Sequence, residues 1–406
     1  MTNLNYNIWL QTALGAGANV KNIFSTFESA EEIYRSTDDE LRISGVFRER
    51  QIGKLRSTNI EDSYRVIEMC GAMGIDVVTP DSACYPEQLL EIENFPLVLY
   101  VQGDISCLRS GIPFGIVGTR SPVQPGSLYA TKALSGALSV SGFTIVSGGA
   151  LGIDSAAHAA AMAAGGKTVV VLGGGIGANY LRTNEALRCA VAQHGALVSE
   201  IPPKTEPRKG AFPIRNRIIA ALSVGVAVME GGKQSGSLIT AERAYSYGRD
   251  VFVLPCDAPT TSNQGVYELM QDGAKPIRCA MDVFEEYLPK FPEKVIVDKS
   301  IDLFRDIRNP DNRFLQSTAD FEKVCKENLY KQRIATKRKK RKLADPLSEQ
   351  ACRVYDYFGD NPLSINDIAE AVFMPTSSVL GALTELEIFG YIELLPDTKY
   401  ILKWEG

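Results

Sequence analysis

Glycine or polar residues follow five successive predicted strands, and together they could form a binding edge. In a doubly wound sheet, the carboxyl ends of the parallel strands meet at one edge, where ligands bind. Bare backbone N–H groups at the helix starts after such turns attract anions, and an arginine adds charge. The sequence therefore predicts an anion-binding edge. Its turns are Gly118-Thr119-Arg120, Ser147-Gly148-Gly149-Ala150, Gly173-Gly174-Gly175, Glu200 and the stretch from Glu230 to Ser237.

The residues of these turns disfavour a nucleotide cofactor. The dinucleotide fingerprint GxGxxG is absent after residues 117 and 146, and the Gly-Lys-Thr at 166–168 precedes a strand instead of following one. The only histidines are His158 and His194, and the eight cysteines form no CxxC pair. We therefore expect no cofactor and no metal site, and reduced thiols in a cytoplasmic protein.

A second group of candidate residues lies at 209–217, just before and within an apolar helix. Cations, an aromatic ring and a side-chain amide are the components of a single-stranded nucleic-acid site. Two other readings stay open: Phe212 belongs to the core, or the arginines pair with Glu200 and Glu230. The residues of this group are Lys209, Phe212, Arg215, Asn216 and Arg217.

Asp154 and His158 are four residues apart at the start of a predicted helix, so they share one face. With Ser147 nearby they invite a catalytic-triad reading, but no GxSxG elbow is present. We favour a structural Asp–His pair that holds the turn. The glycine-rich turn at 147–152 would allow either a phosphate to approach its backbone or neighbouring elements to pack closely, and both interpretations stay open.

Short apolar runs rich in Val and Ile, separated by helical patterns, predict a mostly parallel sheet of extended Rossmann-like type over 76–290. Residues 1–75 predict a small helical module. The net charge of −5 requires any DNA contact to rest on a local basic patch. No apolar run approaches the ~20 residues of a membrane helix, so we expect no membrane partner.

The last third of the chain predicts a linker and a further domain. Residues 291–344 read as a basic linker, because 331–342 holds eight basic residues and no acidic one. Residues 345–406 show three helical stretches and a hairpin, the order of a winged helix. Its presumed recognition helix, TSSVLGALTELEIFG, lacks Lys and Arg. We therefore favour protein contact or packing over duplex DNA for this domain.

Several long stretches stand in one order along the chain: GTRSPVQPGSLYA, SGGALGIDSAAHAAAMAAGGKTVVVLGGG, FPIRNRIIAALS, SGSLITAERAYSYGRDVFVLP and QGVYELMQDGAKPI. Together they resemble the DNA-processing protein A family, also called DprA or Smf. The resemblance implies a homodimer that binds single-stranded DNA without catalysis and loads the RecA recombinase during natural transformation. It also implies that residues 1–75 form a SAM-like or helix-hairpin-helix-like module.

Carried over by motif, the resemblance assigns DNA contacts to Arg120, Lys209, Phe212, Arg215, Asn216 and Arg217. Gly118, Ser147, Gly148, Gly149 and Lys167 are expected along the same pocket edge. Two loops depart from the family pattern: 179–184, with Leu181 where Pro is usual, and 255–265.

Two alternatives from other functional classes remain. One is a nucleoside monophosphate phosphoribohydrolase, because EGGKQSGSLITAE distantly resembles the glycine-rich turn of that group, with Glu242 in the catalytic position. The other is a DNA-sensing regulator whose winged helix reads duplex DNA.

Overall fold

The computed structural model describes residues 3–124, 126–179, 184–256, 258–297, 343, 347–358, 363–394 and 398–402. The chain divides into two compact units, Met1–Phe321 and Glu322–Gly406, which are described separately. The basic segment 331–342, the departure at Leu181 and residues 395–397 within the predicted hairpin lie outside the described residues. The proposed boundaries between the helical, sheet, linker and winged-helix domains stay predictions.

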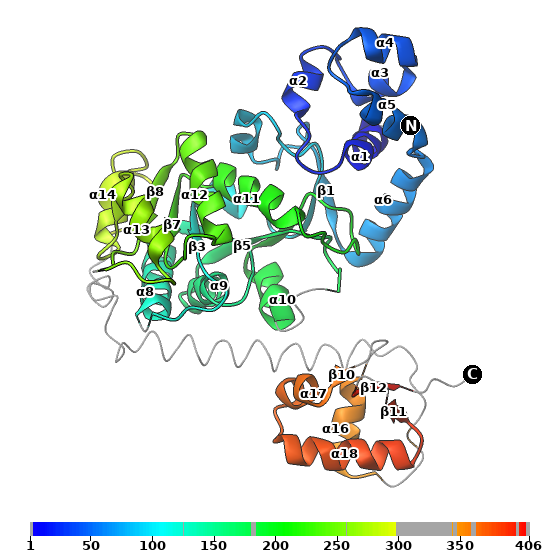
Figure 1. Cartoon of the computed structure of the whole chain (residues 1–406), viewed down its shortest axis with the longest axis vertical. Coiled ribbons are helices and arrows are strands. Elements are labelled where there is room, and N and C mark those ends of the chain that lie inside the picture. The colour runs from blue at the N-terminus through cyan, green and yellow to red at the C-terminus, as the bar shows by residue number, and fades with distance from the viewer. Residues whose placement is uncertain are drawn as a thin grey trace. The chain divides into compact units, whose positions relative to one another are not determined.

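The first unit opens with six helices, drawn in blue in Figure 1, and the first five of them enclose a small apolar core. Trp9, Ile33 and Leu41 are fully buried in that core. Ser29 and Thr37 cap two of the helices with their hydroxyls, which accept from backbone N–H groups three residues on. The helices are α1 (Asn3–Leu14), α2 (Val20–Phe24), α3 (Ala30–Arg35), α4 (Asp38–Ile43), α5 (Glu49–Ser57) and α6 (Glu61–Met73).

A nine-stranded sheet follows, in the order β1-β2-β6-β5-β4-β3-β7-β8-β9. The seven strands from β6 to β9 in this order are parallel, whereas β1 and β2 are antiparallel additions at one edge. The prediction of a mostly parallel sheet is confirmed. The strands are β1 (Asp76–Val78), β2 (Leu99–Gly103), β3 (Ile112–Val117), β4 (Phe143–Ser147), β5 (Lys167–Leu172), β6 (Ala196–Ser199), β7 (Gly225–Val228), β8 (Asp250–Val253) and β9 (Lys275–Pro276).

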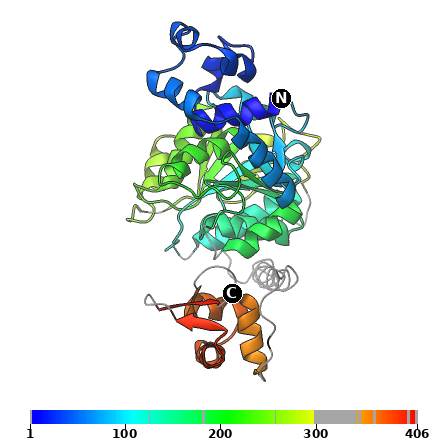
Figure 2. The same cartoon turned by 90° about the vertical axis from the view of Figure 1, so that its right-hand side faces the viewer.

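Helices cover both faces of the sheet, so its central strands are apolar on both sides (Figures 1 and 2). Ile116 packs toward α8 (Ser127–Val140), α9 (Ile153–Ala163) and α14 (Met281–Tyr287). Val117 belongs to the opposite core, with α11 (Ala211–Leu222) and α12 (Gly236–Ser246). The remaining elements are η1 (Glu87–Glu91), α7 (Cys107–Ser110), α10 (Glu185–His194) and α13 (Gln264–Gln271).

The second unit has the helix order and small sheet of a winged helix, as the sequence predicts. Its core gathers Val354, Ile368, Leu383 and Tyr391, all buried. Ser364 begins the second helix with a capping box. The elements are α16 (Glu349–Tyr357), β10 (Leu363–Ser364), α17 (Ile365–Val372), α18 (Thr376–Ile388), β11 (Ile392–Leu394) and β12 (Lys399–Leu402). Within the described ranges of both units, no helix is long and apolar enough to cross a membrane.

Candidate nucleic-acid interface

A cavity of about 400 Å³ opens at the carboxyl end of β3. In the sheet, β3 lies between β4 and β7, where the chain order reverses direction, which is the usual ligand position in such folds. The walls come from the turn after β3, the start of α9, the first turns of α11 and the start of α12. The sequence prediction of a binding edge thus corresponds to a real concavity.

An aromatic ring with two guanidinium groups near it forms one wall of the cavity. The Arg120 Cζ atom lies 5.2 Å from the centroid of the Phe212 ring, and the Arg215 Cζ atom lies 6.0 Å from it. Both distances fall within the range of cation–π attraction. Phe212 is half-buried and Arg120 is exposed. Phe212 is therefore neither a free platform nor a core residue, but a wall whose ring packs against Gly173.

Arg215 is buried and fixed by the backbone of the neighbouring strands. Its Nη1 donates to the carbonyl oxygens of Gly148, at 2.8 Å, and Val171. Its Nε donates to the Asn216 side chain at 3.2 Å, and the Asn216 amide donates to the Gly236 carbonyl at 3.0 Å. These bonds hold a positive charge at a constant place in the cavity wall.

The glycine-rich turn after β4 is packed against protein, so its predicted DNA contacts require correction. Ser147, Gly148 and Gly149 are buried, and the Ser147 hydroxyl donates to the Ile116 carbonyl at 2.5 Å. A Cβ at Gly148 would lie 2.7 Å from Arg215 Nη2, and one at Gly149 would lie 2.7 Å from Val170 Cγ1. The turn is bare because neighbouring elements approach closely, and its backbone is not open to a phosphate.

The prediction that Asp154 and His158 pair with each other is wrong, because each has other partners. The Asp154 carboxylate accepts from the backbone N–H groups of Gly148 and Ala150, at 3.2 and 3.3 Å, so it does hold the turn. His158 instead bonds Thr168 Oγ1 through Nδ1 at 2.7 Å. Because the His158 Nδ1 atom bonds Thr168, a Ser147–His158–Asp154 relay is not formed.

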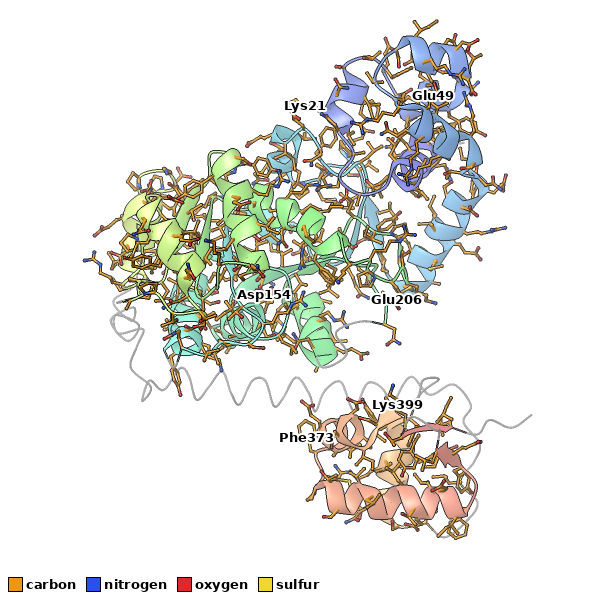
Figure 3. The ribbon with its side chains drawn as sticks, in the orientation of Figure 1. Lys21, Glu49, Asp154, Glu206, Phe373 and Lys399 are labelled. Carbon is orange, nitrogen blue, oxygen red and sulfur yellow. The ribbon has the colours of Figure 1, made fainter. Side chains whose placement is uncertain are left out.

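Burial dominates the titration of both residues. Desolvation raises the pKa of Asp154, although the nearby Arg215 charge and the backbone N–H groups act the other way. Desolvation also lowers the pKa of His158 to about 3, with a smaller effect from Arg215. Asp154 is labelled in Figure 3, inside the sheet unit.

Three further predicted contacts lie elsewhere. Arg217 is 2% exposed and forms an ion pair with Glu200 at 2.5 Å, as the pairing alternative expected. Lys209 is exposed in the loop before α11 and is not among the described residues that line the cavity. Lys167 is the first residue of β5, so it lies at the amino end of that strand, about 16 Å from the carboxyl end where the cavity opens. Its predicted place at the pocket edge is wrong, because it is the first residue of a strand and does not follow one.

Glu230 holds the loop that carries Arg120 instead of pairing with an arginine. Its carboxylate accepts from the N–H groups of Val123, at 2.9 Å, and Gln124. Its carbonyl oxygen accepts from Thr119 N–H at 2.8 Å. The carboxylate is buried, so this loop is fixed at both the backbone and the side chain of one residue.

Of the predicted residues, the structure brings Gly118, Arg120, Phe212, Arg215 and Asn216 together around the cavity. Five further polar residues line the cavity: Thr119, Asp154, Ser235, Ser237 and Thr240. Thr119, Ser235 and Ser237 lie in turns that the sequence predicts as part of the binding edge, and Asp154 was interpreted as a structural residue. Only Thr240 was not singled out from the sequence. Among the residues that the structure describes, no group of three or more His, Cys, Asp or Glu side chains could hold a metal ion.

Comparison with known families agrees with this architecture. A family model described as DNA recombination-mediator protein A matches residues 76–288, which is the region that contains the sheet and the cavity. The chain belongs to the DNA recombination-mediator protein A family. A second model, the DprA winged helix domain, matches residues 338–398. The resemblance found in the sequence motifs is confirmed.

Relatives within this family are similar over most of their length. The DNA processing protein DprA of Bacillus subtilis is 43% identical over 222 residues, covering 55% of this chain and 74% of the relative. Protein Smf of Escherichia coli is 32% identical over 321 residues, covering 79% of this chain and 75% of the relative. The X-ray structure of DNA processing protein A from Streptococcus pneumoniae aligns with a TM-score of 0.60 at 32% identity, covering 70% of this chain and 98% of that chain.

Proposed function

We propose that this DNA recombination-mediator protein binds single-stranded DNA at the cavity beyond β3. The observation that carries the proposal is the Arg120–Phe212–Arg215 arrangement, with 5.2 and 6.0 Å from the guanidinium carbons to the ring centroid. Guanidinium groups attract phosphates, and a half-buried ring offers a surface on which a base can stack. Arg120 is exposed, so it supplies the first contact with an incoming strand.

The finer steps of the function come from the family resemblance. We propose that the bound strand is protected and then transferred to the RecA recombinase, and that the protein acts as a homodimer during natural transformation. Because recombination acts on DNA inside the cell, this proposal places the protein in the cytoplasm. Protein contact, not duplex reading, is proposed for the winged helix.

We propose a binding role without catalysis. The two groups near the cavity that most resemble catalytic ones, Asp154 and His158, are buried and bonded within the fold. Glu242, the residue on which the phosphoribohydrolase alternative depends, is exposed on α12 and is not among the described residues lining the cavity. The geometry thus favours the DNA-binding proposal over the hydrolase.

Fluorescence anisotropy with labelled oligo-dT and a matched duplex, across a salt series, tests the proposal. Loss of one phosphate contact in Arg120→Ala should reduce the slope of log K against log salt by about 0.7 and weaken binding about tenfold. Lys167→Ala is the matched control, because it removes an exposed positive charge at the opposite sheet edge and should bind as the wild type does.

Two results would contradict the proposal. Absence of single-strand binding at low salt would remove its basis, and release of a free base from a nucleoside monophosphate would then favour the hydrolase. Binding that prefers the duplex would favour the winged-helix regulator.

A further inference from the structure

Arg217 lies on the same helix as the cavity residues but faces another part of the molecule. In an α-helix, residues two apart point about 200° from one another. Arg215 therefore faces the cavity, while Arg217 Nη2 donates to Glu200 Oε1 at 2.5 Å. Both side chains of this pair are buried, at 2% and 6% exposure.

Glu200 also receives two contacts from the N-terminal helices. Its Oε1 accepts from the Gly17 backbone N–H at 3.3 Å, and its carbonyl oxygen accepts from Gln11 Nε2 at 2.8 Å. Gln11 also exchanges two bonds of 2.8 Å with the backbone of Val98, just before β2. Glu200 thus connects α11, the carboxyl end of β6 and the N-terminal helices.

The loop that contains Gly17 lies directly on the first turns of α11. A Cβ at Gly17 would lie 3.0 Å from Ile214 Cγ2 and 3.7 Å from Arg217 Nε, and its φ of +79° favours glycine. The helix that follows this loop, α2, is held at Glu93, whose carbonyl accepts from the Lys21 N–H at 2.9 Å. Lys21 is labelled in Figure 3, where the N-terminal helices meet the sheet unit.

We propose that the Arg217–Glu200 pair is a clamp that sets the first turns of α11 against the N-terminal helices. Arg217 is then a positioning residue for the DNA site and not a phosphate contact. This inference rests on the proposed function, because it assigns the pair a role in that same site. The clamp would hold Phe212 and Arg215 in place through the helix they share with Arg217.

The energetics of the pair favour a positioning role over a simple stabilising one. Nε and Nη1 of Arg217 have no hydrogen-bond partner among the described residues. Buried pairs with unused donors are often no more stable than apolar residues of similar size. A group of this kind contributes a defined geometry, and here that geometry joins two elements far apart in sequence.

Coupling of this kind is reciprocal. If the docked N-terminal helices favour the binding geometry of α11, a bound oligonucleotide must favour the docked helices. Oligo-dT should therefore slow hydrogen exchange in the segment 11–21 of the full chain.

Arg217→Met in the full-length protein tests the clamp by anisotropy and hydrogen exchange together. We expect about tenfold weaker oligo-dT binding. The salt slope should be unchanged, since no phosphate contact is removed. The oligonucleotide-dependent protection of 11–21 should be lost. Glu200→Gln, which keeps the side-chain volume, should reproduce this result and replaces Arg217→Met if that variant does not fold.

Glu91→Gln is the control, because it removes a different ion pair of the same unit, Arg249–Glu91 at 2.5 Å, and should leave binding and exchange unchanged. A salt slope reduced by about 0.7 in Arg217→Met would overturn the clamp in favour of a direct phosphate contact. Unchanged affinity and exchange in both clamp variants would overturn it as well. A wild-type protein that does not bind oligo-dT would instead refute the proposed function itself.

Discussion

Gly173 provides a test of Phe212 that changes no charge. This glycine follows β5, and its φ lies outside the left-handed region, so alanine is compatible with the backbone. A Cβ there would lie 2.8 Å from Phe212 Cδ1 and 3.1 Å from Cε1. Carbon atoms pack best at about 3.5–4.0 Å, so in Gly173→Ala the ring must move by about 1 Å.

The displaced ring would lose part of its alignment with an incoming base. Stacking of a base on an aromatic side chain contributes about 1–3 kcal/mol. The middle of this range is about 2 kcal/mol. Loss of half of that energy, about 1 kcal/mol, corresponds to about fivefold weaker binding of oligo-dT. The salt slope should not change, because the number of cations is the same.

Anisotropy with oligo-dT measures both quantities, and Gly210→Ala is the matched control. Gly210 immediately precedes α11, has a φ of −79°, and a Cβ there would meet nothing within 4 Å. The reasoning would be refuted if Gly173→Ala bound as tightly as the wild type while Arg120→Ala bound weakly. Phe212 would then be a structural wall and not a stacking surface.

Three further predictions follow from buried polar groups. His158 stays neutral in the fold, with a pKa of about 3, but titrates near 6.5 when unfolded, so stability should fall by about 2 kcal/mol from pH 7 to 5. Urea unfolding at pH 7 and 5 should show a smaller drop in His158→Gln, and an equal drop would contradict the assignment. Glu230→Ala should free the loop that carries Arg120, weaken oligo-dT binding and speed exchange at 119–124; unchanged exchange would argue against this anchor. Gly148→Ala should lower the urea-unfolding free energy by about 1–3 kcal/mol, because its Cβ would lie 2.7 Å from the Arg215 guanidinium, and an unchanged midpoint would mean that the guanidinium moves freely.

The sequence by itself determined the strands and most of the helices of both units. Continuous apolar runs such as 167–172 form parallel strands because both faces of the sheet are covered by helices. The short strands β9 and β10 escaped prediction, since two residues carry no periodic pattern. The family was also readable from sequence, because several long motifs stand in one order.

The sequence could also place the candidate binding edge, because the carboxyl ends of parallel strands share one side of a sheet. It could not assign the residues of the turn at 147–149. Residue type alone does not distinguish a glycine that a neighbouring side chain requires from a glycine that a ligand requires. Only the packing of Val170 and Arg215 against that turn separates the two readings.

Tertiary structure alone decided the roles of the two arginines in the RNR motif. They are two residues apart, yet the helix turns Arg215 toward the cavity and Arg217 toward Glu200 and the N-terminal helices. The Asp154 carboxylate likewise accepts hydrogen bonds from backbone N–H groups of the turn before α9, and His158 bonds Thr168 instead of Asp154. Residue type and spacing define what a side chain can do, but its partner depends on which distant segment the fold brings against it.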